Sequence, residues 1–280
     1  MRSDHHIHMV LDGVDWKQAI NRHKENVDRA WVHKILADYR EKGFAYLRDG
    51  GDRWGVSAYA RSVAPDYGID YRTPLAPISK AGNYGGFIGE QYGDLKDYIN
   101  LVAEHRRNGA DFIKIMISGL MDFDRFGVLS QEGLPAGEIR ELIHIAHEEG
   151  FSVMAHANGA RTVQTAAEAG VDSVEHGAYL DAEALEAMKE AGVVWVPTLS
   201  TVGNLRGKGR FCEDAVCRIL ESALANVEGF RAMGGLVAVG TDAGAWAVPH
   251  GCGTEEALLA QAGVAEEDLR KADGELKRRF

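Results

Sequence analysis

The amino-acid sequence predicts an α/β fold, specifically a (β/α)8 TIM barrel. Short apolar runs of strand length alternate with helix-patterned stretches along the whole chain. Parallel strands joined by helices require this alternation, and eight such units fit within 280 residues. Several of the helical stretches end with a glycine just past their last turn, which is a common helix stop. We therefore expect a single barrel domain over residues 1–280.

The expected strands leave room for a helix after each one. Clear helical patterns are "LKDYINLVAEHRRNG", "AGEIRELIHIAHEEG" and "DAEALEAMKEAG". A doubly wound open sheet fits the same alternation, but its main support, a GxGxxG turn after the first strand, is absent. In chain order the expected strands are residues 3–10, 43–48, 71–77, 112–117, 152–157, 172–175, 193–197 and 236–240.

Composition and charge narrow the classes of partner. The chain is 45% hydrophobic and 26% charged, with a formal net charge of -11. This acidity argues against nucleic acid and anionic membranes as partners. The expected partner is a small-molecule substrate. The polar first ten residues do not resemble a secretory signal, and Cys212, Cys217 and Cys252 form no CxxC pair. We expect a cytoplasmic protein with reduced thiols, and self-association remains open.

Polar side chains stand at the ends of five of the expected strands. A (β/α)8 barrel builds its active site at the C-terminal ends of its strands, so these side chains are expected to meet. They are His6, His8, Lys114, His156, His176 and Asp242.

The segment "DHHIH", residues 4–8, carries three imidazoles within five positions. Alternate residues of a strand share a face, so His6 and His8 point one way while His5 and Ile7 point the other. His6 and His8 can therefore chelate one ion from inside the barrel, and His5 is expected in the outer layer. A tag remnant or a solvated N-terminus is the structural alternative.

Lys114 lies in the apolar stretch "DFIKIMIS", where it shares a face with Phe112 and Met116. Burial lowers the pKa of an amine and makes it a neutral nucleophile. Two uses follow: a Schiff-base lysine, or a carbamate formed with CO2 that acts as a carboxylate metal ligand. A lysine that reaches solvent at the strand end is the structural alternative.

His156 in "SVMAHANGA", His176 in "DSVEHG" and Asp242 in "LVAVGTDAG" complete the set. Each alone fits a structural imidazole or a helix cap. Together with the other side chains they predict a site for one or two divalent metal ions. Imidazole and carboxylate ligands suit zinc, and also manganese or Fe(II). Two cations need an anionic bridge, which carboxylated Lys114 would supply.

The ordered set of motifs resembles the amidohydrolase superfamily, in particular its imidazolonepropionase-like and prolidase-like branch. The matching stretches are "DHHIH", "RDGG", "GADFIKIM", "MAHANG", "VDSVEHG" and "VGTDAG". The resemblance implies a (β/α)8 barrel with one or two divalent metals. It assigns His6 and His8 to one metal, His156 and His176 to the second, and carboxylated Lys114 as the bridge.

The resemblance also implies that Asp242 is both a metal ligand and a proton shuttle. The expected reaction is hydrolysis of an amide bond in a dipeptide, an N-acyl amino acid or a cyclic amide by metal-activated hydroxide. Asp242 would act as general base and then as general acid. The alternatives are an ester, lactone or phosphoester substrate, a Schiff-base lyase through Lys114, or a non-catalytic barrel. Candidate substrate-binding residues in the loops after the strands are Tyr84, Arg161, Tyr179 and His250.

Three features depart from the resemblance. The segment after the eighth expected strand is short and ends in the charged stretch "EEDLRKADGELKRRF". Many relatives flank the barrel with a β-sandwich built from both chain ends, whereas here the first barrel strand begins at residue 3, so the sandwich is expected to be absent. Asn158 stands where prolidase-like relatives often show another histidine. This difference predicts altered surroundings of the metal or altered contacts to the leaving group.

Overall fold

The strands of the chain are parallel and lie in two hydrogen-bonded sheets. The computed structural model describes residues 2–280. One sheet has the order β1-β2-β3, and the other has the order β10-β9-β8-β7-β6-β4-β5. The strands are β1 (Arg2–Ile7), β2 (Phe44–Asp49), β3 (Asp70–Arg72), β4 (Ile78–Lys80), β5 (Glu90–Tyr92), β6 (Ile113–Met116), β7 (Val153–Ala157), β8 (Ser173–His176), β9 (Val194–Val196) and β10 (Leu236–Val237).

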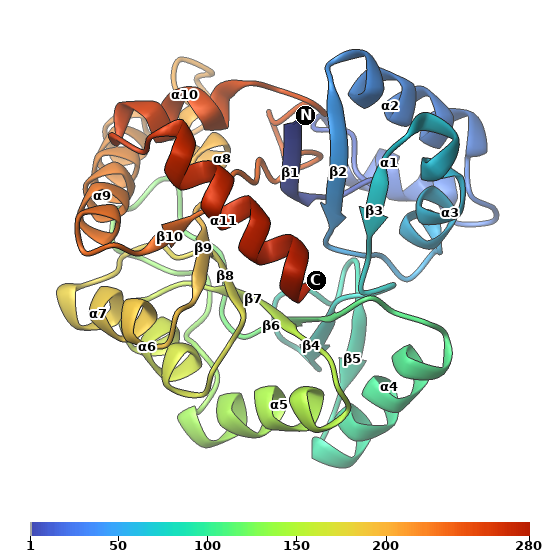
Figure 1. Cartoon of the computed structure of the whole chain (residues 1–280), viewed down its shortest axis with the longest axis horizontal. Coiled ribbons are helices and arrows are strands. Elements are labelled where there is room, and N and C mark those ends of the chain that lie inside the picture. The colour runs from blue at the N-terminus through green and yellow to red at the C-terminus, as the bar shows by residue number, and fades with distance from the viewer. Residues whose placement is uncertain (1) are drawn as a thin grey trace.

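The two sheets together form the (β/α)8 barrel (Figure 1). At one seam, the backbone N–H of His5 on β1 donates to the carbonyl of Val239, which follows β10, over 2.9 Å. The other junction between the sheets lies where the chain continues from β3 to β4, so residues 70–80 together occupy the position of the third barrel strand. There the backbone N–H of Asp111, just before β6, donates to the carbonyl oxygen of Thr73. The expected alternation of strands and helices is therefore confirmed.

The third expected strand, residues 71–77, is split into β3 and β4. Pro74 and Pro77 lack the N–H that a ladder needs, and Leu75 has a left-handed φ of 69°. The chain bends there, so β3 pairs with β2 while β4 pairs with β6. The short strand β5 pairs with β4 and lies between the third and fourth expected strands, where the sequence analysis places no strand.

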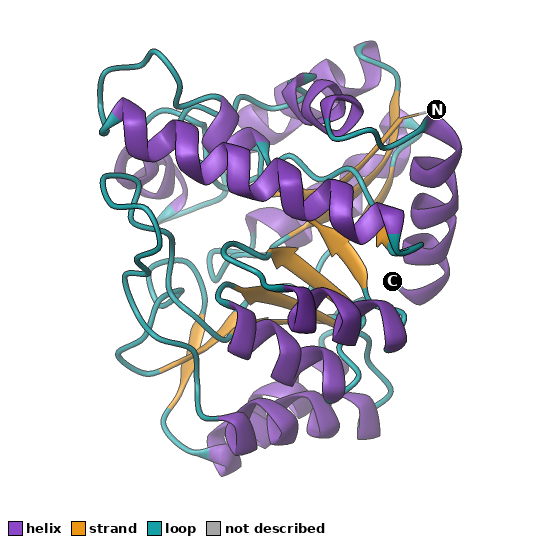
Figure 2. Cartoon of the chain, turned by 90° about the vertical axis from the view of Figure 1, so that its left-hand side faces the viewer, coloured by secondary structure: helices purple, strands orange, loops and turns teal. Residues whose placement is uncertain are grey.

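Helices cover the outside of the barrel (Figures 1 and 2). Asp15, Asp28, Asp94 and Asp181 precede four of them, and each side chain accepts hydrogen bonds from backbone N–H groups of the first turn. The helices are α1 (Trp16–His23), α2 (Arg29–Glu41), α3 (Val56–Val63), the 3-10 helix η1 (Ala64–Tyr67), α4 (Leu95–Arg107), α5 (Ala136–Glu148), α6 (Ala160–Glu168), α7 (Ala182–Glu190), α8 (Ser200–Gly203), α9 (Glu213–Ala232), α10 (Thr254–Gln261) and α11 (Glu266–Arg279).

Helix α11 lies across one end of the barrel (Figure 1). Apolar side chains from the barrel interior pack there against α11 and the residue after it. The loops that carry the predicted site gather at the opposite end (Figure 2). No helix within residues 2–280 is long and apolar enough to cross a membrane. The interior cluster consists of Phe112, Met154, Val194, Val196, Ala238, Ala272, Leu276 and Phe280.

Candidate metal centre

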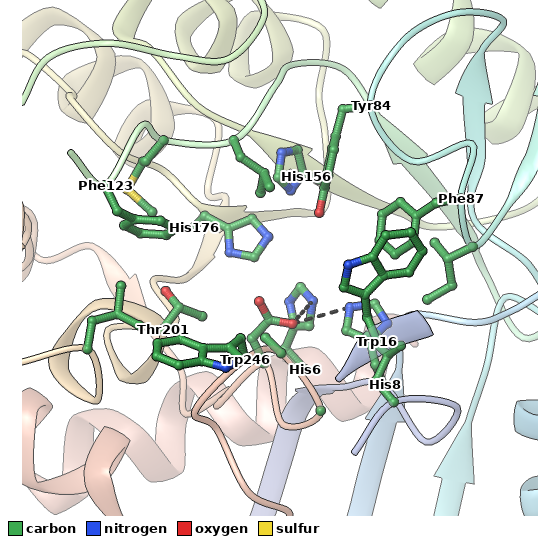
Figure 3. A pocket seen from close by; sticks show the side chains of 18 of the residues that line it. His6, His8, Trp16, Tyr84, Phe87, Phe123, His156, His176, Thr201 and Trp246 are labelled. Atoms are coloured by element: carbon green, nitrogen blue, oxygen red, sulfur yellow. Dashed lines mark ion pairs between the residues drawn. The ribbon is translucent and has the colours of Figure 1, made fainter. Parts of the chain in front are cut away.

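Three of the predicted metal ligands meet at the open end of the barrel. His6 and His8 come from β1 and the residue beyond it, and Asp242 follows β10. Asp242 Oδ1 lies 3.5 Å from His6 Nε2 and 3.2 Å from His8 Nε2 (Figure 3). One ligand atom from each residue lies within 4.8 Å of the others, which is a spacing that can hold a metal ion. Asp242 has a φ of 57°, a backbone conformation that is rare outside glycine and concentrated at functional sites.

His5 does not face the outer helix layer, and that expectation is wrong. A register shift between Asp4 and Ile7 interrupts the strict alternation of β1. The His5 ring is buried and packs against Tyr46, and its Nε2 lies 2.9 Å from Asp273 Oδ1 on α11. His5 therefore belongs to the end of the barrel that α11 covers, away from the metal centre.

His156 and His176 form the second group. Their ring centroids are 4.5 Å apart, and the centroids of His176 and His6 are 5.0 Å apart. His176 Nδ1 lies 2.7 Å from Thr198 Oγ1, and His156 Nε2 lies 3.1 Å from the carbonyl oxygen of Gly119. These contacts orient both rings and leave the other nitrogen of each available as a ligand.

Burial also favours the ligand form of these imidazoles. Burial, together with the charge of Lys114, lowers the pKa of His156 to about 3 and the pKa of His6 well below its ordinary value. The pKa of His176 is also well below its ordinary value, chiefly through burial and then through the neighbouring histidines. Neutral imidazoles offer the lone pair that metal binding requires.

Lys114 lines the same pocket, and its side chain is buried. Within residues 2–280 its Nζ has no hydrogen-bond partner, and neither has His6 Nε2. Burial lowers the pKa of Lys114 to about 8, against the opposing effect of Glu175 and Asp242. Buried polar atoms without partners are costly, so these orphaned nitrogens fit a site that binds metal ions.

Glu175 and Arg48 form a hydrogen-bonded pair in the barrel interior beside His6. The sequence analysis did not single out either residue. Glu175 Oε2 accepts from His6 Nδ1 over 2.7 Å, while its Oε1 accepts from Arg48 Nη2 over 2.8 Å and from Ser173 Oγ over 2.6 Å. All of these side chains are buried. The carboxylate fixes the orientation of the His6 ring with Nε2 toward Asp242. The signal available in the sequence was a pair of opposite charges, Arg48 in FAYLRD and Glu175 in SVEH, on two strands of the barrel.

Asn158 joins the loops around His156. Its Nδ2 donates to the Gly119 carbonyl over 3.0 Å, and its Oδ1 accepts from Ala178 N–H over 2.9 Å. Its own N–H donates to Ser118 Oγ over 2.8 Å. The side chain thus connects the segments that follow β6 and β8 to the end of β7, and it also lines the pocket.

A pocket with a volume of about 640 Å³ leads to the metal centre. Tyr84 lines it as predicted, with its ring centroid 4.9 Å from that of His156 and its hydroxyl pointing into the pocket (Figure 3). Apolar side chains make up most of the wall above the ligands. The aromatic ones are Trp16, Tyr84, Phe87, Phe123, Phe211 and Trp246.

The other predicted substrate residues lie outside this pocket. Arg161 is exposed on α6, and Tyr179 is half-buried in the loop after β8. His250 is buried, with Nε2 at 2.9 Å from the Leu11 carbonyl oxygen and Nδ1 at 3.1 Å from the Tyr39 hydroxyl. Both nitrogens of its ring therefore serve loop structure.

The sequence of this chain is similar to a known protein family and to individual proteins. Residues 55–271 match the model of the amidohydrolase family, a segment that contains Lys114, His156, His176 and Asp242. Ochratoxinase from Aspergillus niger is 31% identical over 147 residues, which are 49% of this chain and 29% of the ochratoxinase. An uncharacterised protein of Mycobacterium tuberculosis is 29% identical over 261 residues, or 85% of this chain and 65% of that protein.

Solved structures show the same fold. A Xaa-Pro dipeptidase with methionine in its active site superposes with a TM-score of 0.76 at 22% identity, covering 96% of this chain and 72% of that one. The A. niger ochratoxinase structure gives a TM-score of 0.77 at 21% identity, covering 95% of this chain and 67% of that one. The resemblance expected from the motifs is confirmed, and the chain belongs to the amidohydrolase family.

Proposed function

We propose that this chain is a metal-dependent hydrolase that cleaves a C–N amide bond in a dipeptide, an N-acyl amino acid or a cyclic amide. The observation that carries the proposal is the convergence of four imidazoles, one carboxylate and a buried amine at the floor of an apolar pocket. Family membership supports the reaction class, and the relatives named as a dipeptidase and an ochratoxinase are consistent with it.

The ligands divide into two groups around Lys114. His6, His8 and Asp242 would hold one divalent ion, and His156 and His176 a second. For Lys114 to bridge them, its neutral Nζ attacks the carbon of CO2 and loses a proton, which gives a carbamate with one negative charge. A bound divalent ion, with zinc favoured by this ligand set, supplies Lewis acidity and lowers the pKa of water toward 7.

The residues of the chain supply the remaining steps. The Asp242 carboxylate accepts a proton from the attacking water and then donates it to the departing amine, so that general base and general acid are one group. The Tyr84 hydroxyl, which points into the pocket, would donate a hydrogen bond to the substrate. Glu175 keeps His6 oriented, and the aromatic walls limit access of bulk water to the reacting bond.

Metal content tests the proposal directly. We expect about two divalent ions per chain in protein purified without chelators, as in binuclear hydrolases. Lys114→Ala should lower this content sharply, while the exposed control Lys189→Ala should not. If the wild type holds a single ion and Lys114→Ala still holds it, Lys114 does not bridge two metal ions. Absence of metal in the wild-type protein would contradict the proposal as a whole.

The unpartnered amine of Lys114 also favours a second candidate, a Schiff-base lyase. That reaction requires a covalent adduct that borohydride can trap, and it requires activity that survives metal removal. The Schiff-base lyase is excluded if amide hydrolysis disappears when the metal is removed and borohydride traps no covalent adduct. A substrate panel that includes esters, lactones and phosphoesters separates the remaining hydrolase alternatives.

A further inference from the structure

One side of the pocket carries a positively charged side chain without an acidic partner. Arg210 lines the pocket in the loop between α8 and α9. Within residues 2–280 its guanidinium forms no ion pair with a carboxylate and instead stacks on aromatic rings. Its Cζ lies 4.3 Å from the Trp246 ring centroid and 5.3 Å from that of Phe211.

The aromatic support of Arg210 is held in place by neighbouring loops. The Phe211 ring packs edge-on to Trp246 at 6.0 Å and against Phe123 at 5.2 Å. The N–H of Cys212 donates to Asp124 Oδ1 over 2.8 Å, which ties this loop to the loop after β6. Arg210 itself is exposed, and its guanidinium lies on half-buried aromatic rings that also form the pocket wall.

Such a stacked guanidinium is suited to binding a carboxylate. Its ring contacts use the face of the group, so its N–H donors remain free along the edge, where they match a carboxylate with two parallel hydrogen bonds. The chain as a whole carries a formal charge of -11, which repels an anionic ligand. An unpaired cation beside an apolar pocket offsets that repulsion locally.

We propose that Arg210 binds the free carboxylate of the substrate, while Phe123, Phe211 and Trp246 hold a bulky apolar group of the same molecule. This inference rests on the proposed amide hydrolysis and narrows its substrates to N-acyl amino acids or peptides with a free carboxylate. The competing cation is Lys17, which also lines the pocket and stacks on Trp16. Trp16 and Trp246 lie on different walls (Figure 3).

A matched pair of compounds tests the role of Arg210. N-benzoyl-L-phenylalanine carries the carboxylate, and N-benzoyl-L-phenylalaninol replaces it with a neutral alcohol; hydrolysis of either releases benzoate. Arg210→Gln should lower kcat/KM for the acid about 10- to 100-fold, mainly through KM, because a charge-assisted pair is lost. The alcohol should be affected far less. The control Lys208→Gln changes an exposed lysine of the same loop that does not line the pocket.

Binding separates this inference from the proposed reaction. Calorimetry on metal-loaded Asp242→Asn protein measures affinity for both compounds without relying on turnover. Tighter binding of the acid than of the alcohol, lost with Arg210→Gln but not with Lys17→Gln, supports the inference even when neither compound is hydrolysed. Equal losses for both compounds, loss through Lys17→Gln instead, or no binding of the acid would overturn it. If the protein hydrolyses the acid and the alcohol equally well, the proposed hydrolase activity stands, but Arg210 does not bind the substrate carboxylate.

Discussion

At the scale of single residues, Asp242 is the group to which the proposed function gives both metal binding and proton transfer. Its Oδ1 lies close to His6 and His8. Burial alone would raise the pKa of Asp242, but His6, His8 and Lys114 together hold this pKa below its ordinary value. Asp242→Asn keeps an oxygen ligand but cannot carry a proton. We expect retained metal with a loss of roughly 10²- to 10⁴-fold in kcat on the best amide substrate. Metal analysis beside steady-state kinetics checks this, and near-normal turnover would rule out the assigned role.

At the scale of secondary-structure elements, Glu255 on α10 connects to α8. Its carboxyl group is fully buried and accepts from Leu199 N–H, Ser200 N–H and Ser200 Oγ over 2.7 to 3.0 Å. Burial raises its pKa to about 8, although these donors favour the carboxylate. Between pH 4.5 and 8 the folded state therefore keeps a proton that the unfolded state has lost. The free energy of unfolding should fall as pH rises through this window, by at most about 1.4 kcal/mol per pH unit from this group.

Urea unfolding at pH 5, 6.5 and 8 measures this contribution. Glu255→Gln removes the titrating group, so the wild type should lose stability relative to the variant as pH rises. Glu256→Gln, at the neighbouring and partly exposed position, serves as the control. Parallel pH dependence in wild type and Glu255→Gln would show that the carboxyl group does not hold its proton in the folded state.

The elements also show where sequence patterns suffice and where they do not. Strands with plain alternation, such as the one around Lys114, could be placed with the correct face inward from the sequence. The face of His5 could not, because the register shift in β1 depends on pairing with a neighbouring strand. The split of the third strand follows from Pro74 and Pro77, which lack the N–H groups that a continuous strand would donate to its neighbours.

At the scale of the whole molecule, the barrel brings the predicted ligands together because each one lies within a barrel strand or in the segment that follows it. The supports of that site could not be predicted in the same way. The bond between Arg48 and Glu175 joins positions 127 residues apart, and only the closed barrel makes them neighbours. The wall beneath Arg210 belongs to loops, whose packing carries no periodic signal in the sequence.

The two ends of the barrel are connected through its interior. The Phe280 ring lies 4.4 Å from Arg48 Cζ and 5.2 Å from the Phe112 ring, and Arg48 binds Glu175, which orients His6. Phe280→Ala removes this support and leaves a cavity, so we expect a loss of about 3 kcal/mol in the free energy of unfolding. Because Arg48 then has freedom to move, metal affinity should also fall.

Urea unfolding and competition for metal with a chelator measure these two effects separately. Phe280→Leu, which retains most of the apolar volume, should restore a large part of both losses. The half-exposed Phe126 provides the control Phe126→Ala, which should change stability far less. A variant at Phe280 that loses stability but keeps its full metal affinity would mean that the metal centre is rigid without α11. If stability and metal affinity fall together, the packing of α11 and Phe280 at the covered end of the barrel helps to hold His6 in its orientation.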